Sequence, residues 1–219
     1  MNRTQYYEDL KALARQVRSE RGLNSPRVLR SDMRRIYKFY RIEIDLWPYR
    51  LKNLRGAIIN DGLGASVMLD KSLPDDPLIF TMGHELKHFL TDSQLALTYC
   101  HTQNVSEPIE IGAEIFAAEL IFPECDFIAW MERSGVERGN CTPEVLVQLK
   151  HETKTTLSYQ GLVKRANFLQ FAEPGVLARV RFAKLEEEMF GTPIYKQDWF
   201  KARRASKRAV NRSNRPNTK

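Results

Sequence analysis

The sequence of 219 residues has few cysteines, few histidines and no long apolar segment. Its three cysteines, Cys100, Cys125 and Cys141, show no C-x-x-C spacing, so the sequence favours a reduced compartment over a disulfide framework. No run approaches the roughly 18 consecutive apolar residues that a membrane span requires. The first ten residues, MNRTQYYEDL, lack the pattern of a signal peptide. We therefore expect a cytoplasmic protein without a membrane partner.

The composition is typical of a globular protein, with 42% hydrophobic and 28% charged residues. The charge is unevenly distributed along the chain. Residues 1–55 carry 14 basic and 6 acidic side chains, residues 56–195 carry 11 and 20, and residues 196–219 carry 9 and 1. Both ends are therefore basic and the middle is acidic. Solvated faces are the default interpretation of this pattern, and contact with nucleic acid or with an acidic protein is the alternative.

The periodicity of apolar residues predicts an α+β protein that is mainly helical. Alternation at 42–46 predicts a strand, and the runs 57–59 and 67–69 flank a Gly-containing loop that is typical of a hairpin. Together they predict a small antiparallel sheet. Caps and helical spacing predict helices at 4–22, 26–40, 76–91, 108–123, 125–132 and 143–152, one from 158, and one at 177–190.

We predict one domain over residues 1–200, which is long enough to bury a single core. Within it, residues 1–41 form basic N-terminal helices, residues 42–123 form the sheet and the core of a candidate site, and residues 124–200 form C-terminal helices. The basic tail 201–219 has too little apolar content to fold, and we predict that it is disordered.

The segment 78–90, LIFTMGHELKHFL, carries the strongest chemical signal. It has helical length, and it holds two of the four histidines of the chain, His84 and His88, with Glu85 beside the first. Residues four apart project from one face of a helix, so both imidazoles can bind one metal ion while Glu85 acts as a general base. This H-E-x-x-H arrangement is typical of zinc hydrolases.

A catalytic zinc usually takes three protein ligands. One layout would place Gly at position 91 and His at position 94, but Thr91 and Gln94 stand there. The second layout takes a glutamate from another helix, and the segment 108–123, PIEIGAEIFAAELIFP, predicts such a helix. Its carboxylates are Glu110, Glu114 and Glu119, and His101 is a competing ligand.

We favour Glu110 as the third ligand. Glu114 lies four residues further on the same face, where it could hydrogen-bond a ligating imidazole. Glu119 is as readily a solvated acid on the exposed side of an amphipathic helix.

The motifs TMGHELKHFL and EIGAEIFAAELIFP resemble the ImmA/IrrE family of metallopeptidases. In that family H-E-x-x-H precedes a segment Glu-x-Glu-Ala-Asn/Asp-x-Phe-Ala-x-x-Leu-Leu-x-Pro. The resemblance implies a zincin-like metallopeptidase domain in which Glu110 is the metal ligand. It places Glu114 at the Asn/Asp position, whereas Gly112 stands where the family has its second Glu.

The predicted activity is zinc-dependent peptide hydrolysis. Glu85 would take a proton from the attacking water and pass it to the leaving amine. Asp92, four residues after His88, could orient that imidazole. Four residues could stabilise the oxyanion, and spacing does not choose among Tyr99, His101, Tyr159 and Arg165. The family resemblance implies that the substrate is a helix-turn-helix transcriptional repressor, whose cleavage would relieve repression in a mobile element or a stress response.

Two other functions remain open. The protein could regulate transcription without catalysis, by binding DNA or a repressor through its basic ends, or it could be the toxin of a toxin-antitoxin pair. The segment 149–169 resembles a helix-turn-helix loosely, with Lys164 and Arg165 on its second helix. A packing helical hairpin is the favoured interpretation of that segment.

Overall fold

The computed structural model describes residues 2–48, 55–60, 64–92, 97–99 and 108–192. The chain divides into two compact units, Met1–Val176 and Leu177–Lys219. The predicted domain boundary at residue 200 and the predicted disorder of the tail 201–219 lie outside the described residues, so both stay predictions. No helix in the described ranges is long and apolar enough to cross a membrane.

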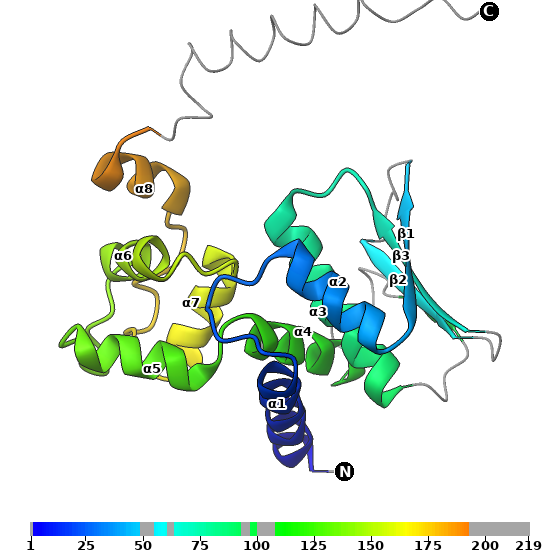
Figure 1. Cartoon of the computed structure of the whole chain (residues 1–219). Coiled ribbons are helices and arrows are strands. Elements are labelled where there is room, and N and C mark those ends of the chain that lie inside the picture. The colour runs from blue at the N-terminus through cyan, green and yellow to red at the C-terminus, as the bar shows by residue number, and fades with distance from the viewer. Residues whose placement is uncertain (1, 49–54, 61–63, 93–96, 100–107, 193–219) are drawn as a thin grey trace, which may run out of the picture. The chain divides into compact units, whose positions relative to one another are not determined.

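The fold is mainly helical with one sheet, which confirms the α+β prediction (Figure 1). In chain order the elements are α1 (Arg3–Glu20), α2 (Arg30–Phe39), β1 (Ile42–Trp47), β2 (Gly56–Asn60), β3 (Ala65–Asp70), α3 (Asp75–Thr91), β4 (Leu97–Tyr99), α4 (Pro108–Ile121), α5 (Glu124–Arg133), α6 (Pro143–Thr153), α7 (Tyr159–Phe168) and α8 (Phe182–Phe190).

Two helices begin later than the sequence predicts. Helix α2 starts at Arg30 rather than at residue 26, because the Asp32 side chain accepts a hydrogen bond from the backbone N–H of Leu29 and fixes the first turn there. Helix α8 starts at Phe182 rather than at residue 177. Arg179 adopts a φ of 58°, a left-handed conformation that a right-handed helix cannot contain.

The sheet is mixed, with strand order β1-β3-β2-β4. Strands β2 and β3 form the predicted antiparallel hairpin, in which Ile58 lies opposite Val67. The prediction of a wholly antiparallel sheet is wrong for β1, which pairs with β3 in parallel, Ile44 opposite Val67. Alternating polarity predicts which face of a strand is buried but not which strand lies beside it. Here β3, with Val67 and Leu69 fully buried, is a central strand between β1 and β2.

Helix α3 packs against the sheet and against α4, so it is the central helix of this unit (Figure 1). A Cβ atom at Gly83 would lie 3.2 Å from the Cβ of Ala117, so the absence of a side chain lets the two helices approach closely. Met82 and Leu86 of α3 and Phe116 of α4 are buried in the core around this crossing.

Helix α1 is joined to α4 and α5 by buried basic side chains. Lys11 pairs with Glu124 at 2.9 Å, and Arg18 donates a hydrogen bond of 2.6 Å to the carbonyl oxygen of Leu120 at the end of α4. Lys11 is 4% exposed and Arg18 is 7% exposed. The default interpretation of the basic N-terminus as a solvated face is therefore wrong for these residues, because they connect α1 to the rest of the unit.

Glu119 is also buried, and it is not a solvated acid. Its carboxylate pairs with Arg15 at 2.9 Å and with Arg165 at 3.1 Å, and it accepts a hydrogen bond from the backbone N–H of Glu124. Charged groups inside proteins are stable only when they are paired and hydrogen-bonded in this way. Glu119 therefore joins α1, α4, α5 and α7.

Candidate metal centre

Two helices position the candidate ligands. Helix α3 begins at Asp75, one residue before the predicted start, and its first turn carries Asp75 and Asp76, whose charges stabilise a helix N-terminus. It continues through His84 and His88 to Thr91. Glu110 comes from the first turn of α4.

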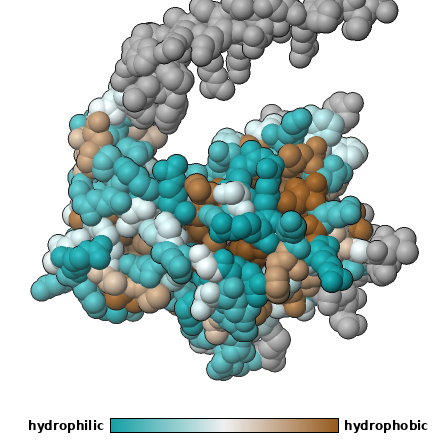
Figure 2. All heavy atoms as spheres, in the orientation of Figure 1, coloured by the Kyte–Doolittle hydropathy of each residue, from teal (hydrophilic) through white to brown (hydrophobic). Residues whose placement is uncertain are grey.

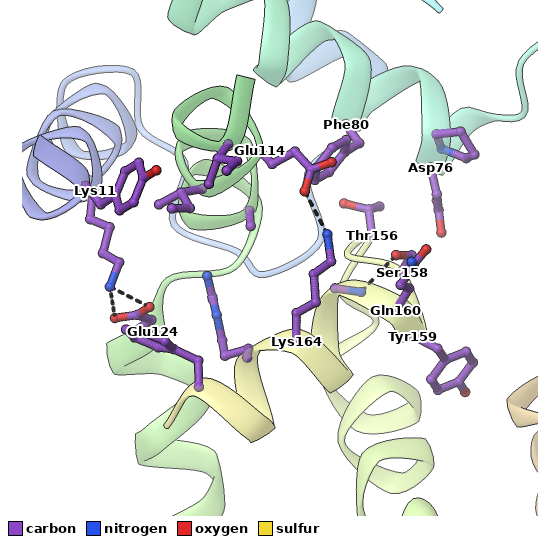
Figure 3. Close-up of a pocket in the computed structure, with 18 of the residues that line it drawn as sticks. Lys11, Asp76, Phe80, Glu114, Glu124, Thr156, Ser158, Tyr159, Gln160 and Lys164 are labelled. Carbon is purple, nitrogen blue, oxygen red and sulfur yellow. Dashed lines mark hydrogen bonds and ion pairs between the residues drawn. The ribbon is translucent and has the colours of Figure 1, made fainter. Parts of the chain in front are cut away.

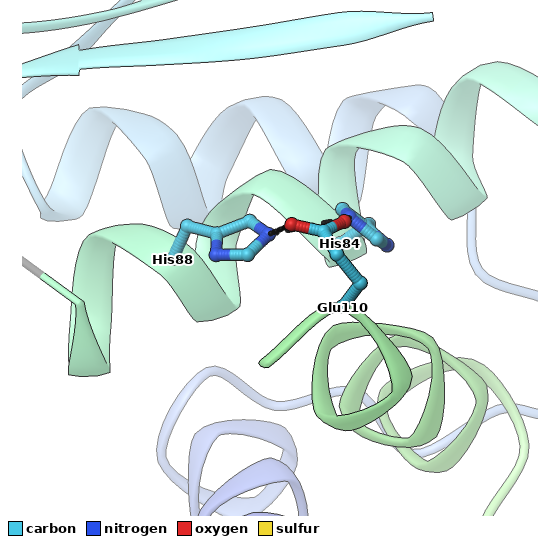
Figure 4. A group of neighbouring side chains, drawn as sticks. All are labelled: His84, His88 and Glu110. Carbon is cyan, nitrogen blue, oxygen red and sulfur yellow. Dashed lines mark hydrogen bonds and ion pairs between the residues drawn. The ribbon is translucent and has the colours of Figure 1, made fainter. Parts of the chain in front are cut away.

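The structure brings His84, His88 and Glu110 together (Figure 4). His84 Nε2 lies 3.2 Å from Glu110 Oε2 and 3.3 Å from His88 Nε2, and His88 Nε2 lies 3.6 Å from Glu110 Oε1. The side chain of His88 is fully buried, whereas those of His84 and Glu110 are 14% and 15% exposed. Solvent can therefore reach part of His84 and Glu110, whereas His88 is shielded from it.

These separations fit a tetrahedral metal ion. Zinc binds histidine nitrogen and carboxylate oxygen at about 2.1 Å, which places two ligand atoms of a tetrahedron about 3.4 Å apart. The two imidazole nitrogens lie 3.3 Å apart, and each lies 3.2 to 3.6 Å from one of the two carboxylate oxygens of Glu110, which is close to that value. Two histidines and one glutamate are also a ligand set of catalytic zinc sites that leave the fourth position open. The cluster can therefore hold a metal ion.

Asp92 fixes the ring of His88. The Asp92 carboxylate lies 2.6 Å from His88 Nδ1, so Nε2 of the same ring faces the cluster. Burial lowers the pKa of His88 more strongly than the hydrogen bond to Asp92 raises it. Burial of Asp92 opposes its ionisation, but hydrogen bonds from His88 and Lys87 outweigh burial and lower its pKa. A neutral imidazole is the form that binds metal.

Glu85 lies on the side of α3 that faces the sheet. Its side chain is buried, and its Cγ lies close to Gly56, the first residue of β2. Burial raises the pKa of Tyr37 on α2, and the negative charge of Glu85 adds to that shift. Glu85 is thus held between α2, α3 and β2, next in sequence to His84.

The other predicted candidates are not part of this cluster. Glu114 pairs with Lys164 of α7 at 2.7 Å (Figure 3), so the structure does not place it behind a ligating imidazole. His101 lies outside the described residues, as does the side chain of Tyr99. Arg165 pairs with Glu119.

Sequence reasoning missed two features of the site. Lys87, the second variable position of the H-E-x-x-H motif, is fully buried and pairs with Asp92 at 2.7 Å. The available signal was a lysine within the largely apolar segment 78–90, five residues before an aspartate. The second feature is the packing of α1 against α4. A Cβ atom at Gly112 of α4 would lie 3.1 Å from the ring of Tyr6 of α1. The space beside Gly112, where the resembled family has a glutamate, is thus taken by α1.

A groove of about 820 Å³ lies between α1, α3, α4 and α7 (Figure 3). Its apolar lining includes Phe80, Ile111 and Ile115. Phe80 lies four residues before His84 on α3, and Glu114 lies four residues after Glu110 on α4, so the groove runs along the helix faces that carry His84 and Glu110. Hydrophobic side chains are also visible in the middle of the face in Figure 2, among hydrophilic ones. The groove is large enough to accept several side chains of a polypeptide.

Comparison with known protein families gives a match. The model of a peptidase family, described as the IrrE N-terminal-like domain, matches residues 43–159. The matched range covers more than half of the chain and includes α3, α4 and the whole candidate centre. No curated protein matches the chain.

Proposed function

Because the chain belongs to the peptidase family described as the IrrE N-terminal-like domain, we propose that it is a zinc-dependent endopeptidase. The observation that carries this proposal is the convergence of His84, His88 and Glu110, whose candidate ligand atoms lie within 4.8 Å of one another. Family membership supports peptide hydrolysis, and the ligand set favours zinc over magnesium or calcium, which prefer oxygen ligands.

Zinc in this site would bring the pKa of a water molecule to about 7 and polarise the carbonyl of the substrate. Glu85 acts as general base and takes a proton from the water while the water oxygen bonds to the carbonyl carbon. It then donates that proton to the leaving amine as the C–N bond breaks. Asp92 keeps His88 in the orientation that directs Nε2 toward the cluster.

The groove supports a polypeptide substrate. Its apolar walls can bind side chains of the substrate, and its exposed charged pair, Lys164 with Glu114, can bind polar backbone groups (Figure 3). The proposed substrate is a helix-turn-helix repressor, by analogy with the resembled family.

The basic residues of the hairpin α6–α7 favour a separate DNA-binding partner. On α7, Lys164 pairs with Glu114 and Arg165 pairs with Glu119, so both side chains face α4. A helix that reads DNA presents such side chains to the major groove. We therefore interpret α6–α7 as a packing hairpin and assign DNA binding to the substrate.

The test measures metal content and cleavage together. The wild-type chain and Glu110→Ala are purified side by side, their zinc content is measured, and each is incubated with labelled casein and with a purified helix-turn-helix repressor from the same genome. The proposal predicts about one zinc per wild-type chain, loss of most zinc in Glu110→Ala, and cleavage of the repressor by the wild type only.

The alternatives give different results. Binding of the repressor or of DNA without cleavage, by the wild type and by Glu85→Gln alike, would support the non-catalytic regulator. Growth arrest that persists with Glu85→Gln would support a toxin that does not act by proteolysis. A wild-type chain that binds no zinc even after zinc is added would overturn the peptidase proposal.

A further inference from the structure

Lys87 is a fully buried lysine at the junction of α3 and α4. Its Nζ donates to Asp92 Oδ2 at 2.7 Å and to the carbonyl oxygen of Ile109 at 3.1 Å. The ring of Tyr6, on α1, lies 5.8 Å from the same nitrogen. A buried ammonium group is strongly destabilising unless it is paired in this way.

Both hydrogen-bond acceptors of Lys87 are next to candidate metal ligands. Asp92 holds the ring of His88 at 2.6 Å, and Ile109 precedes Glu110 in the first turn of α4. One ammonium group therefore contacts the residue that orients His88 and the backbone that carries Glu110.

Helix α1 packs on α4 beside Lys87. A Cβ atom at Gly112 would lie 2.7 Å from Leu10 and 3.1 Å from Tyr6, so α1 packs directly on α4 at this point. Where the resembled family has a glutamate, the chain has Gly112, and the aromatic ring of Tyr6 lies near the ammonium group of Lys87 instead. A lysine nitrogen near an aromatic face is stabilised by the ring.

We infer that Lys87 is a positioning residue of the metal centre, which sets the distance between the histidines on α3 and the glutamate on α4. This inference rests on the proposed metallopeptidase function and deepens it. Lys87 acts through Asp92 and through the backbone at Ile109, and it does not contact the reacting atoms. Outer partners of this kind change metal affinity by about 10- to 100-fold when they are removed.

The test compares zinc affinity in Lys87→Met and Lys87→Gln with that of the wild type, by competition with a chelator. Methionine keeps the apolar stem and removes the charge, whereas glutamine keeps one amide donor. We expect zinc affinity to fall about 10- to 100-fold in Lys87→Met and by a smaller factor in Lys87→Gln. The absorption spectrum of the cobalt(II) form, which reports the geometry of the ligands, should change in the same order.

The matched control is Lys11→Met. Lys11 is a buried lysine of α1 whose ion-pair partners, Glu8 and Glu124, lie outside the metal centre. Both methionine variants should unfold at lower temperature, because each leaves a carboxylate without its cation. Only the Lys87 variants should change zinc affinity and the cobalt spectrum.

The outcomes separate this inference from the proposed function. If Lys87→Met fails to fold, the zinc affinity and the cobalt spectrum of Lys87→Gln test the positioning role. Wild-type zinc affinity and an unchanged spectrum in the folded Lys87 variants would overturn the positioning role alone. Absence of zinc binding by the wild-type chain would overturn the proposed function and the positioning role with it.

Discussion

The two ends of α4 both carry buried or half-buried charged groups, and they differ in how those groups are paired. Near the end of the helix, Glu119 lies between the guanidinium groups of Arg15 and Arg165. In the first turn, Glu110 lies beside two imidazoles whose Nε2 atoms are 3.3 Å from each other.

The difference is one of donors and acceptors. Around Glu119 each carboxylate oxygen faces a cationic donor, so the group is complete and serves to join helices. Around Glu110 two imidazole nitrogens and a carboxylate oxygen lie within 4.8 Å of one another, and atoms of these types can bind one metal ion. The first arrangement is a structural ion pair, and the second is a candidate metal site.

The largest expected effects come from substituting Glu110 and Glu119, which lie at opposite ends of α4. Glu110→Ala should lose most of its bound zinc, because two histidines alone hold the ion weakly, while its unfolding temperature without metal changes little. Glu119→Gln should keep its zinc and lose about 3–5 kcal/mol of stability, because the substitution removes the charge that compensates Arg165. Metal analysis and chemical denaturation check both.

Glu114→Ala is the control for this pair, since it removes a half-exposed glutamate from the same helix. It should keep the zinc and most of the stability, because exposed ion pairs contribute at most about 1 kcal/mol. Loss of zinc in Glu114→Ala or in Glu119→Gln would show that the contrast between the two ends is wrong.

The next effect separates catalysis from metal binding at the Glu110 end. Glu85→Gln should keep its zinc and lose about 10²- to 10⁴-fold in the rate of repressor cleavage, because an amide cannot accept the proton of the attacking water. Single-turnover rates, with zinc content measured on the same samples, check this. A Glu85→Gln variant with wild-type activity would exclude the proposed general base.

A smaller effect tests the second contact of His88. Asp92→Asn keeps the size of the side chain but weakens the acceptor for Nδ1, so zinc affinity should fall about 10- to 100-fold. Chelator competition measures the change. Asp126→Asn, an acid of α5 with no contact to the centre, should leave zinc affinity unchanged, and an equal loss in both variants would point to a nonspecific effect of charge.

The smallest effect concerns the groove. Phe80→Ala removes an apolar wall one turn before His84. It should raise KM for the repressor by about 10-fold with kcat nearly unchanged, since the lost contact binds the substrate and its transition state equally. Steady-state kinetics check the split. A fall in kcat with constant KM would mean that Phe80 shapes the metal centre rather than the groove.

The sequence by itself determined the local elements of this protein. Helical periodicity places His84 and His88 on one face of α3. Short-range caps located two helix starts, because the side chains of Thr142 and Ser158 each accept a hydrogen bond from a backbone N–H three residues ahead. These features depend only on interactions between residues within one or two helical turns of each other, so a short stretch of sequence is enough to predict them.

The tertiary structure decided everything that depends on contacts between distant segments. It made β1 parallel to β3, directed Glu114 toward Lys164 rather than toward the histidines, and placed Glu119 between two arginines. It also connected Lys87 to the first turn of α4. Periodicity shows that a helix face is buried but not which neighbour it contacts, because packing between elements is set by their relative positions and by close approaches such as that at Gly83.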